Sequence, residues 1–439
     1  MLSALLFSPR GGSAHVARAL AANLPAHGWE VTLVSGSQPG HGDARAFYAG
    51  LNIHAVDFST GDAPLHPSYE DRPGAPDRVF ARVDDDEYEE HVEAWSRALE
   101  HAGAADHDVL HLNHLTPLHE AAARVAPEVP VVTHLHGTEL LMLEAIVQGA
   151  DWPYGDAWAE RMRRWAQGSE RLLVLTPSHI ERAAELLGVE PERCVVSPNG
   201  FDPDLFVPRD IDRRAFWRRH LVEEPKGWKP GAPEGSVRYT EAEVEALAEG
   251  PVMVAVGRFT AVKRLPQLID AWARAWRDLP PTASLVLVGG HPGEYEGEHP
   301  LEAIERTGAR NVFLAGWHGH DELPEFLSAA DVQVLNSARE QFGAVLVEGM
   351  ACGLPAIAVN RLGPAEIVDD GHNGWLVEPD DADGLVAAIV SALGDEEQRR
   401  RRSEAARRTA LDRYSWPAIS GRVAEVLQAA VDHTVAGAA

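Results

Sequence analysis

Short runs of valine and leucine alternate with longer helical patterns along almost the whole chain. Strands separated by helices in this way are typical of parallel sheets with crossover connections. In the first half, the runs that predict buried strands are Leu2–Phe7, Val31–Ser35, Val109–Asn113, Val131–Leu135, Leu172–Thr176 and Cys194–Ser197. In the second half, they are Val252–Gly257, Leu285–Gly289, Val312–Ala315, Val332–Asn336, Ala356–Val359 and Trp375–Val377. The pattern predicts an α/β fold with two doubly wound parallel sheets.

Helical periodicity occupies the segments between these strands. One amphipathic pattern covers Ala14–His27 and ends at Gly28, and another covers Tyr88–His101. The segment from about Thr60 to Asp86 is rich in Pro, Gly and Asp and predicts a long loop. In the second half, the predicted helices are Leu265–Arg277, Leu323–Ala329, Ala344–Ala351, Pro364–Val368 and Asp381–Leu393.

The length of 439 residues is too great for one ordinary core, and it predicts two domains of about 200 residues each. Residues 1–205 form the expected N-terminal Rossmann-like domain, and residues 251–415 form the C-terminal one. The charged segment Arg209–Gly250 contains Pro and Gly and has little periodicity, so residues 206–250 are expected to be a connector with a surface insertion. Two facing domains of this kind place a ligand cleft at the carboxyl ends of both sheets.

Acidic residues outnumber basic residues by 67 to 39, which gives a formal charge of −28. This balance argues against nucleic acid as a partner and disfavours adsorption to anionic lipid. A basic run at Arg161–Arg164 makes a membrane contact conceivable, but a solvated helix face is favoured. The two cysteines, Cys194 and Cys352, are typical of a reducing compartment. No apolar run approaches the roughly 18 residues of a membrane span, and Met1–Arg10 lacks signal-peptide features, so a cytoplasmic location is expected.

An anion-binding arrangement is predicted after the strand that ends at Asn336. A loop there carries Glu340, and Gly343 opens a helix whose second turn carries Glu348. Free N–H groups at a helix N-terminus bind anions, and glycine allows a ligand to approach the backbone closely. Glu348 can accept the two hydrogen bonds that a ribose diol offers, and Glu340 can accept from sugar hydroxyls. Carboxylates beside a diphosphate require nearby cations.

Arg258 and Lys263 are the expected cations. They follow the strand Val252–Gly257 in a loop just before a helix, and loops at the carboxyl ends of parallel strands line the binding crevice. A guanidinium can bind phosphate oxygens bidentately, whereas an ammonium acts as a point charge.

Several motifs together resemble family 4 glycosyltransferases, which are retaining, metal-independent enzymes of the GT-B fold. The residues that carry the resemblance are Glu340-x7-Glu348, the segment Gly257–Lys263, Ser197-Pro198-Asn199-Gly200, Gly11-Gly12-x-Ala-His-Val and His134-Leu135-His136-Gly137. The resemblance covers nearly the whole chain. One departure is Arg264, which stands where the family commonly has glycine.

The resemblance implies a role for each matching position in the second half. Arg258 and Lys263 are implied to contact the donor diphosphate, Glu348 the ribose, and Glu340 the transferred sugar. The backbone of Phe342, Gly343 and Ala344 is implied to contact the sugar or the phosphates. The loop Gly316-Trp317-His318 is implied to lie beside the base.

In the first half, the resemblance implies that Gly11 and Gly12 approach the diphosphate and the acceptor. It also implies that His136 lies near the sugar ring. After Tyr414-Ser415-Trp416, a final helix of about residues 416–439 is implied to complete the N-terminal domain.

The expected reaction moves a sugar from a nucleoside diphosphate, with UDP favoured over GDP and ADP, to a hydroxyl acceptor. Covalent double displacement needs a carboxylate nucleophile, but hydroxyls are the implied partners of Glu340 and Glu348. Front-face displacement is therefore favoured, in which the departing phosphate takes the acceptor proton. The acceptor stays open between a small molecule, a glycan and a lipid, and the sequence does not indicate an oligomeric state.

No cofactor or metal ion is expected. The pairs His111/His114, His134/His136 and His318/His320 have ligand-like spacing, but no Cys or carboxylate cluster completes a site. Two alternatives stay open, a sugar-nucleotide epimerase of the same fold and a non-catalytic sugar-nucleotide-binding protein. A nicotinamide dehydrogenase is disfavoured because no Gly-x-Gly-x-x-Gly follows the first strand.

Overall fold

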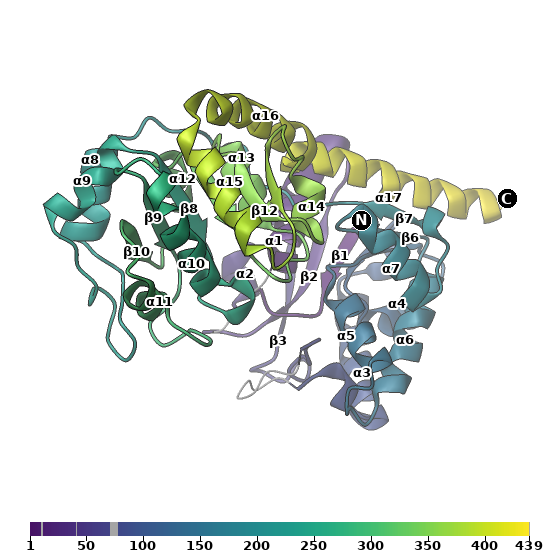
Figure 1. Ribbon diagram of the computed structural model, residues 1–439. Helices are drawn as coiled ribbons and strands as arrows, with labels where there is room; N and C mark the ends of the chain where they lie inside the picture. The colour runs from purple at the N-terminus through teal and green to yellow at the C-terminus, as the bar shows by residue number, and fades with distance from the viewer. Residues whose placement is uncertain (10–11, 41, 71–77, 439) are drawn as a thin grey trace. The chain divides into compact units, whose positions relative to one another are not determined.

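The computed structural model describes residues 1–9, 12–40, 42–70 and 78–438. The chain divides into two compact units (Figure 1). The first unit comprises Met1–Asn199 and Trp416–Ala439, and the second comprises Gly200–Ser415.

The first unit contains a parallel sheet of seven strands in the order β3-β2-β1-β4-β5-β6-β7. The strands are β1 (Leu2–Leu5), β2 (Thr32–Ser37), β3 (Ile53–Asp57), β4 (Leu110–Asn113), β5 (Val131–His134), β6 (Arg171–Val174) and β7 (Cys194–Val196). All six expected strands are confirmed, but β3 was not predicted. This strand lies at the sheet edge, and its polar His54 and Asp57 interrupt any apolar run.

Helices cover both faces of this sheet. Alternate strand residues point to opposite faces, as Leu172 and Leu173 of β6 do: Leu172 joins the core under α3–α7, and Leu173 joins the core under α1 and α17. The helices are α1 (Gly12–Asn23), α2 (Ala44–Phe47), α3 (Asp85–His101), α4 (Leu118–Val125), α5 (Thr138–Val147), α6 (Gly155–Gly168), α7 (Pro177–Leu187) and α17 (Trp416–Ala438), with short 3-10 turns η1 (Leu24–His27), η2 (Phe80–Arg82), η3 (Ala104–Asp106) and η4 (Pro191–Arg193).

The helix expected over Ala14–His27 is divided in the structure. The α-helix ends at Asn23, and a 3-10 turn with Pro25 near its start continues to His27 before Gly28 ends it with φ 85°. Proline lacks the N–H that an α-helix needs in its interior, so the change of helix type occurs where Pro25 enters.

The second unit contains a parallel sheet of six strands in the order β10-β9-β8-β11-β12-β13. The strands are β8 (Val252–Val256), β9 (Ser284–Val288), β10 (Val312–Gly316), β11 (Val332–Leu335), β12 (Ala356–Val359) and β13 (Gly374–Val377). Each expected strand of the second half is confirmed, with ends that differ by at most one residue.

The helices of the second unit again lie on both sheet faces, with α10 and α15 in the core on one face and α13 against β11 and β12. They are α8 (Arg213–Arg218), the π-helix η5 (Arg219–Glu223), α9 (Glu241–Glu249), α10 (Leu265–Ala275), α11 (Pro300–Thr307), α12 (Leu323–Ser328), α13 (Ala344–Ala351), α14 (Gly363–Ile367), α15 (Ala382–Gly394) and α16 (Glu396–Tyr414), with 3-10 turns η6 (Ala261–Lys263) and η7 (Trp276–Asp278). Within the described part of the chain, no helix combines the length and apolar character needed to cross a membrane.

The segment Arg209–Gly250 has more structure than its weak periodicity indicates. It contains α8, η5 and α9, and its residues Trp217, Leu221 and Trp228 are buried. All three side chains lie in the second unit.

Candidate functional site

Lys263 and Glu340 meet in the second unit. Lys263 ends the 3-10 turn after β8, and Glu340 lies in the loop after β11. Lys263 Nζ donates to Glu340 Oε2 at 2.6 Å, and each side chain is 22% exposed. The two loops are also joined through their backbones, because Ala338 N–H donates to the Val262 carbonyl at 2.8 Å. The structure thus brings together two of the four predicted catalytic side chains.

Arg258 lies in the same loop and is exposed. Together with Lys263, it lines a small cavity of about 10 Å³ at the carboxyl ends of β8 and β11. No other described residue forms a hydrogen bond or an ion pair with Arg258. Its guanidinium therefore offers all its donors to a ligand.

Arg264, which follows Lys263, has a backbone conformation that glycine adopts more easily. Its backbone has φ 52° and ψ 40°, in the left-handed region that glycine adopts without a steric cost. Two contacts hold the arginine there: its side chain pairs with Asp380 at 2.7 Å, and its carbonyl accepts from Asn336 Nδ2 at 3.3 Å.

The N-terminus of α13 lies beside this ion pair. Gly343 precedes the helix with φ 98°, and a Cβ placed on it would lie 3.5 Å from Cγ of Glu340. Phe342 is buried against the ring of Tyr414, whereas Ala344 is exposed. The exposed start of the helix presents backbone N–H groups next to an ammonium, which is a suitable place for a phosphate.

Glu348 is buried and pairs with His320, which the sequence indicated only through its spacing from His318. His320 Nε2 lies 2.9 Å from Glu348 Oε1. This hydrogen bond, with the charges of Glu348, Asp321 and Asp202, raises the pKa of His320 above its ordinary value, against the effect of burial. His320 therefore occupies one of the two carboxylate oxygens of Glu348.

Two aromatic rings follow β9 and β10. Trp317, next to Gly316, is 44% exposed. The His291 ring stacks on it with a centroid separation of 4.6 Å and an interplanar angle of 28°. An exposed stack of this kind offers a flat surface to a nucleotide base. His318 points elsewhere, because its ring is buried against Phe326.

In the first unit, His136 follows β5 and contacts the end of β4. Its Nε2 lies 3.0 Å from Asn113 Oδ1, and its ring stacks on that of His134 at 4.6 Å. Burial, reinforced by the neighbouring His114 and His134, lowers the pKa of His136 well below its ordinary value. The ring is therefore neutral at physiological pH.

A buried carboxylate holds the turn that carries His136. Glu139 Oε1 and Oε2 accept the His136 backbone N–H at 3.3 and 3.2 Å, and Oε1 lies 2.5 Å from His114 Nδ1. Glu139 is fully buried, and Gly137, between the two residues, has φ 90°.

Gly12 is the first residue of α1 and is exposed, with open space around its Cα. Gly11 lies outside the described residues.

No site role was predicted for Asn113 and Glu139, and His320 was noted only for its metal-ligand-like spacing from His318. Asn113 had a usable signal, since it is a polar residue at the carboxyl end of a predicted strand. Glu139 follows the His136-Gly137 turn at the start of a helix, where carboxylates accept backbone N–H groups. His320 carried no such signal, because its pairing with Glu348 depends on the tertiary fold.

Comparison with known proteins adds relatives that span the chain. The model of "Glycosyl transferases group 1" matches residues 239–409, and that of "Glycosyltransferase Family 4" matches residues 10–205. N-acetyl-alpha-D-glucosaminyl L-malate synthase of Bacillus anthracis is 25% identical, over 92% of this chain and 90% of that protein. D-inositol 3-phosphate glycosyltransferase of Xylanimonas cellulosilytica is 27% identical, over 89% of this chain and 93% of that protein.

Solved structures share the fold. Anabaena Alr3699/HepE in complex with UDP-glucose has a TM-score of 0.66 at 19% identity, with 98% of this chain and 99% of that chain covered. Sucrose-phosphate synthase from Thermosynechococcus elongatus also has a TM-score of 0.66 at 19% identity, with 97% and 98% covered.

Proposed function

This chain belongs to the family 4 glycosyltransferases and has their GT-B fold, and from this premise we propose that it transfers a sugar from a UDP-sugar to a hydroxyl acceptor with retention at the anomeric carbon. The observation that carries the proposal is the ion pair of Lys263 with Glu340 beside the N-terminus of α13. An ammonium and helix N–H groups can bind a diphosphate, and a carboxylate can accept hydrogen bonds from the hydroxyls of a sugar.

The proposed step is a front-face displacement. The bond between the anomeric carbon and the diphosphate oxygen breaks, and a bond from that carbon to the acceptor oxygen forms on the same face. The acceptor hydroxyl gives its proton to the departing phosphate oxygen. Negative charge on the diphosphate grows along this path, so Lys263 and Arg258 stabilise the transition state more than the ground state.

We propose the remaining contacts from the family resemblance and from the chemistry of each group. Glu348 accepts from the ribose, and Glu340 accepts from the sugar, while the Trp317–His291 stack borders the base. His136 contacts the sugar as a neutral ring. Lys263 and Arg258 supply the positive charge that a divalent cation supplies in other transferases, so the proposed reaction needs no metal ion.

The choice of UDP has support from a relative by fold, since Alr3699/HepE was solved with UDP and with UDP-glucose. The acceptor is open to a direct screen, in which L-malate and D-inositol 3-phosphate are informative first compounds because two relatives are named for them.

Lys263→Ala tests the proposal. Loss of a preorganised donor to the leaving group is expected to lower kcat by about 10²–10³, with a smaller effect on KM. The measurement is release of UDP under saturating donor. Arg408→Ala is the control, because Arg408 is an exposed cation of α16 in the same unit and outside the site, and its kcat should equal that of the wild type. An unchanged kcat with a raised KM in Lys263→Ala would show that Lys263 only binds the donor.

A further inference from the structure

Residues Lys226–Tyr239, which we call the bracket, run against the end of β10. Their backbones are so close that no side chain fits at Gly227 or Gly316. A Cβ on Gly316 would lie 2.2 Å from the Lys226 carbonyl oxygen, and a Cβ on Gly227 would lie 2.4 Å from the Leu314 carbonyl oxygen. Real Cβ contacts are not this short, so two glycines are required where the backbones cross. The bracket therefore lies directly against the residue that precedes Trp317.

Trp228 connects the bracket to the loops after β8 and β9. Its side chain is buried, and Nε1 donates to the Gly290 carbonyl at 2.9 Å. The indole stacks on Phe259, the neighbour of Arg258, with a centroid separation of 5.8 Å. It also packs against His299 at 4.6 Å.

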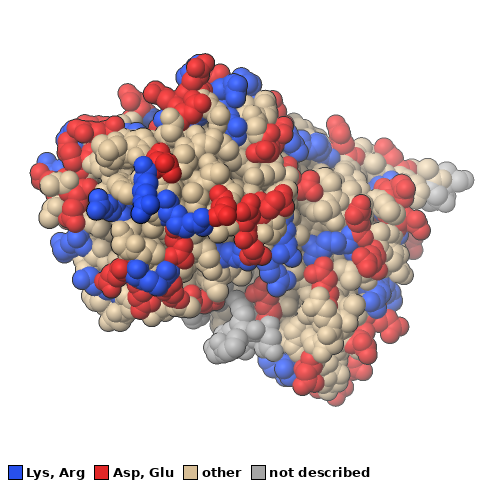
Figure 2. Space-filling view, viewed as in Figure 1, with Lys and Arg blue, Asp and Glu red and all other residues tan. Residues whose placement is uncertain are grey.

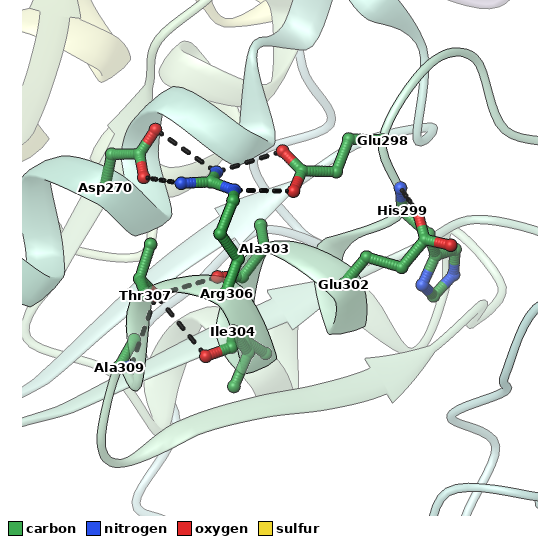
Figure 3. A network of polar contacts seen from close by, with 9 residues as sticks. All are labelled: Asp270, Glu298, His299, Glu302, Ala303, Ile304, Arg306, Thr307 and Ala309. Carbon is green, nitrogen blue, oxygen red and sulfur yellow. Dashed lines mark hydrogen bonds and ion pairs between the residues drawn. The ribbon is translucent and has the colours of Figure 1, made fainter.

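The loop between β9 and α11 is fixed independently at its far end. Arg306 of α11 forms ion pairs with Asp270 of α10 and with Glu298, as Figure 3 shows. Next to Glu298, His299 caps α11 through the Leu301 N–H, and the Glu302 carboxylate accepts the His299 N–H at 2.8 Å. Trp228 thus holds the start of the loop, and the Arg306 network holds its end.

The two rings of the stack are each one residue from a bracket contact. His291 follows Gly290, which Trp228 binds, and Trp317 follows Gly316, which abuts Lys226. Tyr239, at the end of the bracket, accepts a hydrogen bond from the Leu314 N–H of β10 at 2.9 Å. The bracket therefore sets the separation of the two loops that carry the stack.

We propose that the bracket positions the nucleotide-base surface of the donor site, and that the hydrogen bond from Trp228 to Gly290 is a positioning contact on which base selectivity depends. This inference rests on the proposed function, since it concerns the donor nucleotide of that reaction. On this proposal, the bracket contributes to nucleotide binding by the second unit.

The test compares two buried tryptophans, Trp228 and Trp272, whose indole N–H groups each donate to a backbone carbonyl. Trp228→Phe keeps an aromatic ring but removes the N–H that binds Gly290. Trp272→Phe makes the same change at a buried tryptophan of α10 whose Nε1 donates to the Arg310 carbonyl at 2.8 Å, away from the stack. Calorimetric titration of each full-length protein with UDP and with GDP gives the two dissociation constants, and thermal melting gives the loss of stability.

We expect Trp228→Phe to weaken UDP binding by about tenfold, because a loop that Trp228 no longer holds must be ordered when the nucleotide binds, and to reduce the ratio of GDP to UDP dissociation constants. Trp272→Phe should lower Tm comparably but leave the UDP dissociation constant within about twofold of the wild type, because its partner lies outside the stack. Equal UDP affinities in the two variants would overturn the inference.

Tyr239→Phe serves if Trp228→Phe does not fold, because it removes only the hydroxyl that binds Leu314. It should also weaken UDP relative to the wild type, and an unchanged UDP affinity and base preference in this variant would equally overturn the inference. A wild-type protein that binds neither UDP nor GDP would instead contradict the proposed donor, whatever the variants do.

Discussion

At the residue scale, the hydrogen bonds around Asn113 decide which nitrogen of His136 carries a proton. Asn113 Nδ2 donates to the Ala4 carbonyl at 3.2 Å, which leaves Oδ1 facing His136 Nε2 at 3.0 Å. Since Oδ1 can only accept, Nε2 must carry the hydrogen, and Nδ1 of the neutral ring is an acceptor. His136 is therefore suited to accept a hydrogen bond from a sugar hydroxyl.

Asn113→Leu removes the acceptor that fixes the hydrogen on Nε2 of His136, so the ring should populate both neutral tautomers. We expect kcat to fall by about tenfold, the cost of a lost orienting hydrogen bond of about 1.4 kcal/mol. The ¹⁵N chemical shifts of the His136 ring should move from those of a fixed Nε2–H form toward a mixture. Asn373→Leu is the control, because Asn373 is an equally buried amide bonded to backbone groups of the second unit. Unaltered ring shifts in Asn113→Leu would contradict this assignment.

The pair of His320 and Glu348 makes a second residue-scale prediction, on stability against pH. The pKa of His320 is raised in the folded protein. Its stabilising contribution is therefore complete below the ordinary histidine pKa and is lost as pH rises through the raised value. The wild type should be more stable than His320→Gln near pH 6, by less than about 1 kcal/mol because half of the ring is exposed, and the difference should vanish at alkaline pH. A stability difference that grows with pH, measured by thermal melts between pH 6 and 9, would exclude the pair as its source.

At the element scale, the sequence predicted what local pattern determines. β8 is an unbroken apolar run and β11 is interrupted only by Gln333, so the positions of these strands and of the loops that follow them, which carry Lys263 and Glu340, were predictable. The position of β3 was not predictable, because a strand at the edge of a sheet does not need an apolar run. The fold of Arg209–Gly250 was also not predictable from the local sequence pattern, because Trp217 and Trp228 are buried by residues distant in sequence.

Helix α17 gives the element-scale prediction. It packs through Val423 and Leu427 into the same core as Val16 and Leu20 of α1. Val423→Ala should lower the free energy of unfolding of the first unit by about 2 kcal/mol, from lost burial and the cavity left behind. Val435→Ala on the same helix should change it by less than about 0.5 kcal/mol, because Val435 is 66% exposed. Denaturant unfolding of both variants measures the difference, and equal losses would show that α17 does not stabilise this core.

At the scale of the whole molecule, the charge of −28 opposes the binding of any diphosphate. Figure 2 shows acidic side chains over much of the visible face, with Lys and Arg interspersed. Attraction for a nucleotide-sugar donor is therefore expected from local groups, for which we propose Lys263 and Arg258, and not from the overall field.

A nucleotide that binds the folded second unit should raise its melting temperature. With ligand at 100 times its dissociation constant, the gain is about 2.7 kcal/mol. We expect UDP to give the largest shift among UDP, GDP and ADP at equal concentration. The same shift should appear in Val423→Ala, because that substitution lies in the first unit. Equal shifts for all three nucleotides would contradict the preference for UDP.

The hydroxyl of Tyr239 has a consequence for how copies of the protein meet. β10 is the outer strand of its sheet, and an outer strand with free N–H groups is a template on which a strand of another chain can grow the sheet. At Leu314 that N–H is already taken by a side chain, and the Lys226–Gly227 backbone lies against the carboxyl end of the strand. A second chain must displace the bracket before it can extend the sheet, so these residues also protect this edge from pairing with another strand.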